Sequence, residues 1–185
     1  MMNLARYERY DEFTFGHSIR VCLLTLSLAA TLTRDERVLN RVGMAALLHD
    51  IGKARVPFEI LHAKGRLDDR ERAEMGRHPE HGAAILLSMD EVDPLAVAVA
   101  FGHHRTPALG GYPRTVDGAP LSLATNVIKI CDVYEALTAV RHYKPRMPRR
   151  RGYRVMRSMQ APLEAGMLRP FIKVNCAALP ATLIE

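Results

Sequence analysis

The chain has 185 residues, of which 48% are hydrophobic and 25% charged, so it suits one soluble domain with a buried core and is too apolar for general disorder. The formal net charge of +6 favours anionic partners such as phosphorylated ligands, although charge alone identifies none. The three cysteines are widely spaced, which argues against a disulfide framework or a zinc knuckle and favours a cytoplasmic setting.

Helical periodicity dominates the chain and strand patterns are nearly absent, which predicts an all-α fold. The first helix is predicted over about residues 11–30, with His17 on its inward face. The apolar stretch within it, residues 21–30, is about half as long as a membrane span must be. A capping box from Thr33 to Glu36 predicts the start of a second helix, which should end where Gly52 supplies a stop.

Shorter helices are predicted after a loop at residues 53–57. Their starts are marked by a capping box from Asp68 to Glu71, by Pro79 as the first helical residue, and by Asp93 followed by proline. The helix that Pro79 opens should run to about residue 89, and the one after Asp93 through residue 101.

The second half of the chain begins with an irregular glycine-rich loop around residues 110–118. A long helix is predicted next, over about residues 121–140. Residues 141–154 hold seven arginine and lysine side chains and two prolines, and we interpret them as a mobile or ligand-facing connection. Packing helices over about 152–185 would complete a single domain spanning residues 1–185, whose motif-bearing core is about 11–144.

Histidines and aspartates stand at predicted helix ends, and together these residue types suit a divalent metal such as iron, manganese or zinc. The set is His17, His49, Asp50, His78, His103, His104 and Asp132. Adjacent helical residues point about 100° apart, so His49 and Asp50 can converge on one site only near a helix end. A lone buried histidine is more often a hydrogen-bonded core residue than a ligand, so the ordered set carries the inference.

The order and spacing of these residues resemble the HD superfamily of metal-dependent phosphohydrolases, and most closely its HD-GYP group. The superfamily signature is matched by the string HDIGK at residues 49–53. The resemblance to the HD-GYP group rests on four further strings. They are HPEHG at 78–82, the double histidine followed by GYP at 111–113, DVYEALT at 132–138 and RHYK at 141–144. The resemblance covers roughly residues 11–144.

This resemblance implies a compact multi-helix HD-domain bundle around a buried binuclear metal site. One metal would be held by His17, His49, Asp50 and Asp132. The second would be held by His78, His103 and His104, with Asp50 bridging the two. The ions would be iron or manganese, with zinc, nickel and magnesium as alternatives, and they would carry a bridging hydroxide.

The implied activity is hydrolysis of cyclic di-GMP to linear pGpG, with onward cleavage to GMP left open. Asp50 and Lys53 would be the catalytic residues, and the Lys53 ammonium would steady charge developing on phosphorus. The resemblance assigns substrate binding to Asp11, Lys53, Tyr112, Arg141 and Lys144. Apart from Lys53, each of these can equally be a solvated or packing side chain.

Two departures from the HD-GYP pattern bear on function. Residues 105–110 keep the family's loop length but lack its acidic residue and its aspartate, whose place Ala108 takes, which puts substrate recognition in doubt more than metal binding. The glutamate that some members use for a third metal is replaced by Phe13, so we predict two metals. The remaining histidines, His62, His81 and His142, are interpreted as structural or surface residues.

Two alternative functions stay open. The chain can be a phosphohydrolase of another nucleotide or phosphate ester, or a catalytically degenerate binding or adaptor domain in bacterial signal transduction. The basic run at residues 149–151 suits phosphate, but no recognition motif supports a nucleic-acid polymer as partner. A homodimer, or association with a sensor domain, is compatible with the sequence without being required by it.

Overall fold

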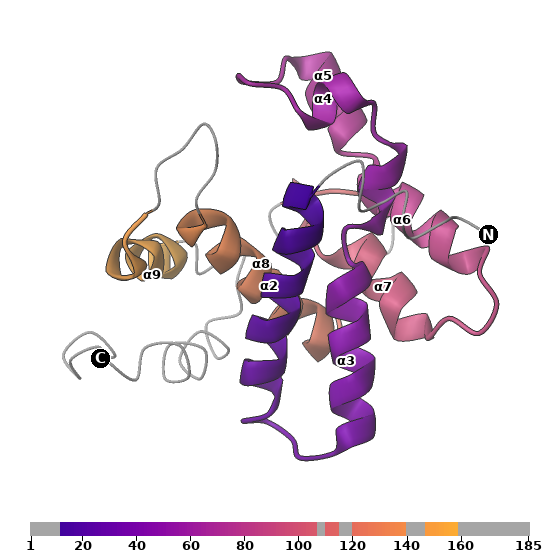
Figure 1. Cartoon of the computed structure of the whole chain (residues 1–185), viewed down its shortest axis with the longest axis vertical. Helices are drawn as coiled ribbons and strands as arrows, with labels where there is room; N and C mark the ends of the chain where they lie inside the picture. Colours follow the sequence, from indigo (N-terminus) through magenta and orange to yellow (C-terminus); the bar gives the residue numbers. More distant parts are fainter. Residues whose placement is uncertain (1–11, 107–109, 115–119, 140–146, 159–185) are drawn as a thin grey trace.

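The computed structural model describes residues 12–106, 110–114, 120–139 and 147–158, and within them the chain is almost entirely helical (Figure 1). The α-helices are α2 (Glu12–Ala29), α3 (Glu36–Leu48), α4 (Phe58–Leu61), α5 (Asp69–Met75), α6 (His78–Leu87), α7 (Pro94–Gly102), α8 (Leu123–Thr138) and α9 (Arg149–Ser158). A 3-10 helix, η1 (Ile51–Arg55), follows α3. In the described residues the only strand pair is β1 (Arg105–Thr106) with β2 (Gly110–Gly111). The expected all-α class is confirmed.

The bundle is built on α2, which packs against α3 on one side and α8 on the other (Figure 1). Helix α7 packs on α3 and α6, and α6 lies against η1. The shared core includes the fully buried side chains of Leu28, Leu86, Val99, Ile128 and Ile130. Burying each such side chain contributes roughly 1.5–3 kcal/mol, so this packing fixes the helices from which the polar cluster projects.

The start of α3 differs from the prediction. The N-cap is Asp35, whose Oδ1 accepts from the backbone N–H groups of Arg37 at 2.8 Å and Val38 at 3.4 Å. Thr33 lies outside the helix, and its hydroxyl oxygen accepts from the Asp35 N–H. The capping box from Thr33 to Glu36 was therefore wrong, because a carboxylate two residues later was also available to accept the first helical N–H groups.

The other predicted starts agree better with the structure. The capping box from Asp68 to Glu71 is confirmed, with both reciprocal hydrogen bonds formed. Asp93 is the N-cap of α7 and accepts from the Leu95 N–H. Helix α6 begins one residue before Pro79, so the proline is its second residue.

The segment after α3 was predicted as a loop, but it forms η1. Gly52 lies inside this 3-10 helix, where its role is close packing. A Cβ atom there would come within 1.9 Å of the His78 carbonyl oxygen and 2.4 Å of the Gly82 nitrogen. The predicted helix stop at Gly52 was therefore wrong in mechanism: α3 ends at Leu48, and the glycine allows η1 to lie directly against α6.

The long helix α8 is confirmed with tighter bounds, and Ser122 caps its start. The predicted connection at 141–154 was wrong over its last residues, because α9 begins at Arg149. Tyr153 and Met156 of α9 are buried, and the Tyr153 ring stacks on Tyr134 of α8 at 5.1 Å between centroids. The packing helices predicted beyond residue 158 lie outside the described residues, so the single-domain organisation stays a prediction. Among described residues no helix combines the length and apolarity that crossing a bilayer requires.

Candidate metal centre

Every predicted metal ligand lies in one polar cluster inside the bundle. The histidines and aspartates form two groups, and within each group the candidate ligand atoms all lie within 4.8 Å of one another. The first group is His17, His49 and Asp132, and the second is Asp50, His78, His103 and His104. All but His104 are buried. The cluster therefore brings together residues from α2, the α3–η1 junction, α6, the end of α7 and α8.

Asp50 lies between the two groups. Its Oδ2 is 3.5 Å from His17 Nε2 and 3.4 Å from His49 Nε2. Its Oδ1 is 3.3 Å from His78 Nε2 and 3.6 Å from His103 Nε2. One carboxylate thus faces both groups, an arrangement that suits a bridging ligand.

The histidine rings are oriented by contacts made at Nδ1. His49 Nδ1 donates to the Ala46 carbonyl at 2.7 Å, and His78 Nδ1 donates to the Met75 carbonyl at 2.7 Å. His103 Nδ1 lies 3.0 Å from the Ala100 carbonyl. With the proton on Nδ1, a neutral ring keeps the Nε2 lone pair, and these lone pairs face inward. A ring held by a hydrogen bond from one nitrogen to a backbone carbonyl, with the other nitrogen left to face the site, is typical of histidines that bind metals.

The interior of the cluster fits a cation. His49 Nε2 and Asp50 Oδ1 are buried and have no hydrogen-bond partner. His78 Nε2 and His103 Nε2 are 3.3 Å apart, although both rings hold their proton on the opposite nitrogen. Buried polar atoms are costly when unpaired, and facing lone pairs repel. Divalent ions, one in each group, would satisfy these atoms, so the His/Asp donor set fits a metal site.

Burial and charge set distinct protonation states in the metal-free cluster. Burial alone would raise the pKa of Asp50, but the positive charge of Lys53 holds that pKa well below its usual value. Burial lowers the pKa of His104 to about 2, assisted by the neighbouring His103. His17 is the exception: burial opposes its charge, yet hydrogen bonds to Asp132 and Glu135 raise its pKa to about 9.

Two residues that the sequence analysis missed support His17 from behind. Glu135 is buried in α8, and its Oε2 accepts from His17 Nδ1 at 2.5 Å. Its Oε1 accepts from Arg20 Nε at 2.5 Å. A sequence signal was available: Glu135 follows Asp132 by three residues and Arg20 follows His17 by three, a spacing that places each pair on one helix face.

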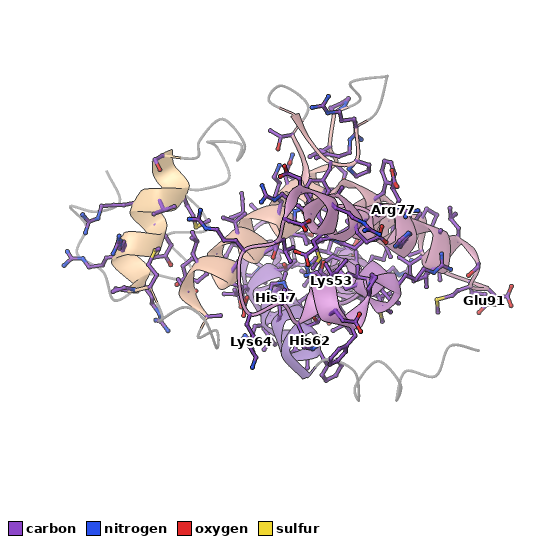
Figure 2. All side chains as sticks on the ribbon, turned by 90° about the horizontal axis from the view of Figure 1, so that it is seen from above. His17, Lys53, His62, Lys64, Arg77 and Glu91 are labelled. Carbon is purple, nitrogen blue, oxygen red and sulfur yellow. The ribbon has the colours of Figure 1, made fainter. Side chains whose placement is uncertain are left out.

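Lys53 lies at the rim of the cluster. Its Nζ donates to Asp50 Oδ2 at 2.5 Å, and its side chain is 22% exposed. His17 and Lys53 are neighbours in the view from above, and both contact the same Asp50 oxygen (Figure 2). The ammonium is therefore beside the cluster and still reachable from solvent.

Tyr112 covers the second group. Its ring lies 4.8 Å from the His104 ring and 6.1 Å from the His78 ring, measured between centroids, and it is 38% exposed. The backbone just before it is possible only for glycine: Gly111 has φ +83°, and a Cβ there would lie 2.4 Å from the His104 carbonyl oxygen. The GYP segment thus folds back over the double histidine.

Some predicted site residues lie outside the described residues. They are Asp11, Arg141 and Lys144. His142, which was interpreted as a structural or surface residue, Ala108 of the altered loop and the side chain of Phe13 also lie outside the described residues. Among the described histidines, His62 and His81 belong to neither ligand group. His62 is exposed and its ring stacks on Phe58, which agrees with the expected surface role.

The fold and the site define a helical domain built around a buried His/Asp metal cluster. The HD domain family matches residues 5–163, and the chain belongs to this family. The sequence resemblance to the HD superfamily is thereby confirmed.

The chain is similar in sequence to longer cyclic dinucleotide phosphodiesterases. The chain is 36% identical over 173 residues to the cyclic di-GMP phosphodiesterase PA4108 of Pseudomonas aeruginosa, covering 94% of this chain and 42% of that protein. It is 37% identical over 138 residues to the 3′3′-cGAMP-specific phosphodiesterase 3 of Vibrio cholerae, covering 75% and 30%. The chain thus spans less than half the length of these relatives.

A solved structure shares the fold. The protein Bd1817 of Bdellovibrio bacteriovorus, described as an HDG"Y"P protein, superposes with a TM-score of 0.70 over 89% of this chain and 53% of that chain. The sequence identity is 16%, so this likeness speaks for the helical architecture alone.

Proposed function

We propose that the chain is a metal-dependent phosphodiesterase that hydrolyses cyclic di-GMP to linear pGpG, with cleavage of pGpG to GMP as an open second step. The observation that carries the proposal is Asp50, which faces two groups of histidines at once. The names of the relatives supply the substrate class, because four of them are called cyclic di-GMP phosphodiesterases and a fifth is called a probable one.

The proposed ligand assignment follows the two groups. His17, His49, Asp50 and Asp132 would hold one divalent ion, and Asp50, His78, His103 and His104 the other. Imidazole with carboxylate suits iron or manganese, and zinc, nickel and magnesium are the alternatives. When bound, such ions lower the pKa of water and withdraw charge from phosphoryl oxygens.

Asp50 and Lys53 are the proposed catalytic residues. Asp50 stays ionised beside Lys53, so it can act as a ligand without first losing a proton. The Lys53 ammonium is within reach of a phosphate that approaches the cluster from solvent, since its side chain is partly exposed. Its fixed positive charge would stabilise the extra negative charge of the transition state.

Substrate binding is proposed for Tyr112, Lys53, Asp11, Arg141 and Lys144. The support for Tyr112 is its exposed ring above His104, which can stack on a guanine base. Arginine and lysine at 141 and 144 suit phosphate oxygens. For those two residues and for Asp11, the support is the resemblance in sequence alone.

The test is turnover by the metal-loaded protein. The chain is loaded anaerobically with ferrous iron or manganese and incubated with cyclic di-GMP, and the products are separated by chromatography. We expect pGpG from the wild type and none from the double variant His49→Ala/Asp50→Ala. If fully metallated wild type leaves the dinucleotide intact, the proposal is wrong.

A second candidate is hydrolysis of another cyclic dinucleotide or phosphate ester. It is favoured by the loop at residues 105–110, which lacks the acidic side chains of the HD-GYP pattern, and by relatives named 3′3′-cGAMP-specific phosphodiesterases. The same assay with both cyclic dinucleotides in competition separates the candidates. Faster loss of 3′3′-cGAMP than of cyclic di-GMP would favour the second.

A further inference from the structure

A buried lysine lies behind the double histidine, at a place that the metal cluster does not use. Lys129 is in the middle of α8, one helical turn before Asp132, and is 7% exposed. Its Nζ donates to the Arg105 carbonyl oxygen at 2.5 Å and to Thr106 Oγ1 at 2.9 Å. Both acceptors belong to β1, which follows His103 and His104 directly. The ammonium thus joins α8 to the segment that carries these two candidate ligands.

The segment that Lys129 holds is a very small hairpin. Strands β1 and β2 form two residue pairs, Arg105 with Gly111 and Thr106 with Gly110. The Tyr112 N–H adds a long hydrogen bond of 3.3 Å to the His104 carbonyl. Even full-length isolated two-stranded hairpins are only marginally stable in water. A hairpin of this size therefore depends on contacts with the rest of the fold.

The position of the Tyr112 ring depends in turn on this hairpin. Tyr112 follows β2 directly, and the backbone turns back at Gly111 so that the ring reaches His104. Lys129 holds β1, and β1 pairs with β2. The lysine therefore fixes the position of the Tyr112 ring indirectly. Lys129 holds β1 through hydrogen bonds to two specific acceptors. A neutral side chain of similar length would fill the same space without holding β1.

We propose that Lys129 is a positioning residue that fixes the β1–β2 hairpin and so holds Tyr112 over the metal cluster for substrate binding. The substrate part of this inference rests on the proposed function, whereas the hairpin part does not. Lys129 contributes to substrate affinity through Tyr112, while the metal content of the cluster is independent of it.

The first experiment needs no substrate. Hydrogen exchange is measured on the metal-loaded protein for peptides that cover residues 104–112, in the wild type and in Lys129→Met. We expect exchange of this segment to accelerate about tenfold in the variant, as befits the loss of hydrogen bonds from a charged donor, while bound metal per chain is unchanged. The matched control is Lys64→Met, at an exposed lysine between α4 and α5.

Two further variants keep the test decisive if Lys129→Met folds poorly. Thr106→Val removes one acceptor and leaves the lysine in place, so a smaller acceleration confined to the same peptides is expected. Lys129→Arg keeps a charged donor and should restore most of the protection. Unchanged exchange at residues 104–112 in both Lys129→Met and Thr106→Val would overturn the proposal.

The second experiment connects the hairpin to substrate. Steady-state kinetics with cyclic di-GMP should show KM raised about tenfold in Lys129→Met with kcat within about threefold of wild type. Tyr112→Ala should raise KM similarly, and the double variant should be no worse than either single one, because both changes remove the same contact. Additive effects would show that Lys129 does not act through Tyr112.

The two experiments fail in different ways. If wild-type protein does not hydrolyse cyclic di-GMP, the proposed function is wrong, and the exchange measurement still decides whether Lys129 holds the hairpin. If exchange accelerates in an active enzyme but KM is unaffected, the proposed function survives and the positioning role is overturned.

Discussion

His17 Nδ1 donates to Glu135 Oε2 over 2.5 Å, which joins two residues 118 positions apart and turns His17 Nε2 toward Asp50 and Asp132. The other Glu135 oxygen is held by Arg20, so the carboxylate cannot rotate away. A carboxylate behind a ligating histidine fixes its tautomer and raises its basicity. Arg20, Glu135 and His17 therefore act as one orienting chain from the surface to the cluster.

Replacing the carboxylate should weaken metal binding at the first group. We expect Glu135→Gln to lower metal affinity about 10- to 100-fold, because the amide is a weaker acceptor for the Nδ1 proton. The measurement is a manganese titration by calorimetry. Glu59→Gln, at an exposed glutamate in α4, is the control and should bind as wild type. Wild-type affinity in Glu135→Gln would contradict this role.

Removing the shared carboxylate should empty both metal positions. Because Asp50 faces both histidine groups, we expect Asp50→Asn to retain well under half of the wild-type metal, as measured by plasma mass spectrometry. Manganese should raise the melting temperature of the wild type and not of this variant, since a ligand stabilises only a fold that binds it. Asp69→Asn, fully exposed in α5, should behave as wild type. Full metal retention by Asp50→Asn would argue against a shared ligand.

Lys53 should affect turnover more than metal content. We expect Lys53→Met to lower kcat about 100- to 1,000-fold, the range seen when one preorganised donor to a developing charge is removed. Bound metal should change little, because the lysine contacts Asp50 from the solvent side. Lys64→Met again serves as the control. A variant that loses its metal in parallel with its activity would show that Lys53 supports the site instead of the reaction.

The close approach of η1 and α6 should make Gly52 intolerant of any side chain. We expect Gly52→Ala to lower the free energy of unfolding of the metal-free protein by about 1–3 kcal/mol, because its Cβ would overlap the backbone at His78 and Gly82. The measurement is chemical denaturation. Gly65→Ala is the matched control, since a Cβ there meets nothing within 4 Å, and its stability should change by less than about 0.5 kcal/mol. Equal stabilities for the two variants would contradict the packing role.

The candidate ligands were predictable because their signal is local. Imidazole and carboxylate side chains recur along the chain, at helix ends or, for His17 and Asp132, inside helices, and a string such as HDIGK at residues 49–53 can be recognised without knowledge of its surroundings. Helix starts were predictable for the same reason at Asp68 and Asp93, where one good acceptor precedes the helix. Where two acceptors competed, at Thr33 and Asp35, the local signal did not decide between them.

The sequence by itself determined the all-helical class and the set of seven candidate ligands. Only the tertiary structure decided that Asp50 faces both groups, that Glu135 orients His17, and that Lys129 holds the hairpin under Tyr112. The reason is physical. Residue type and helical spacing are properties of a few neighbouring positions, whereas the contacts between different elements join residues 23 to 118 positions apart and exist only once the helices have packed.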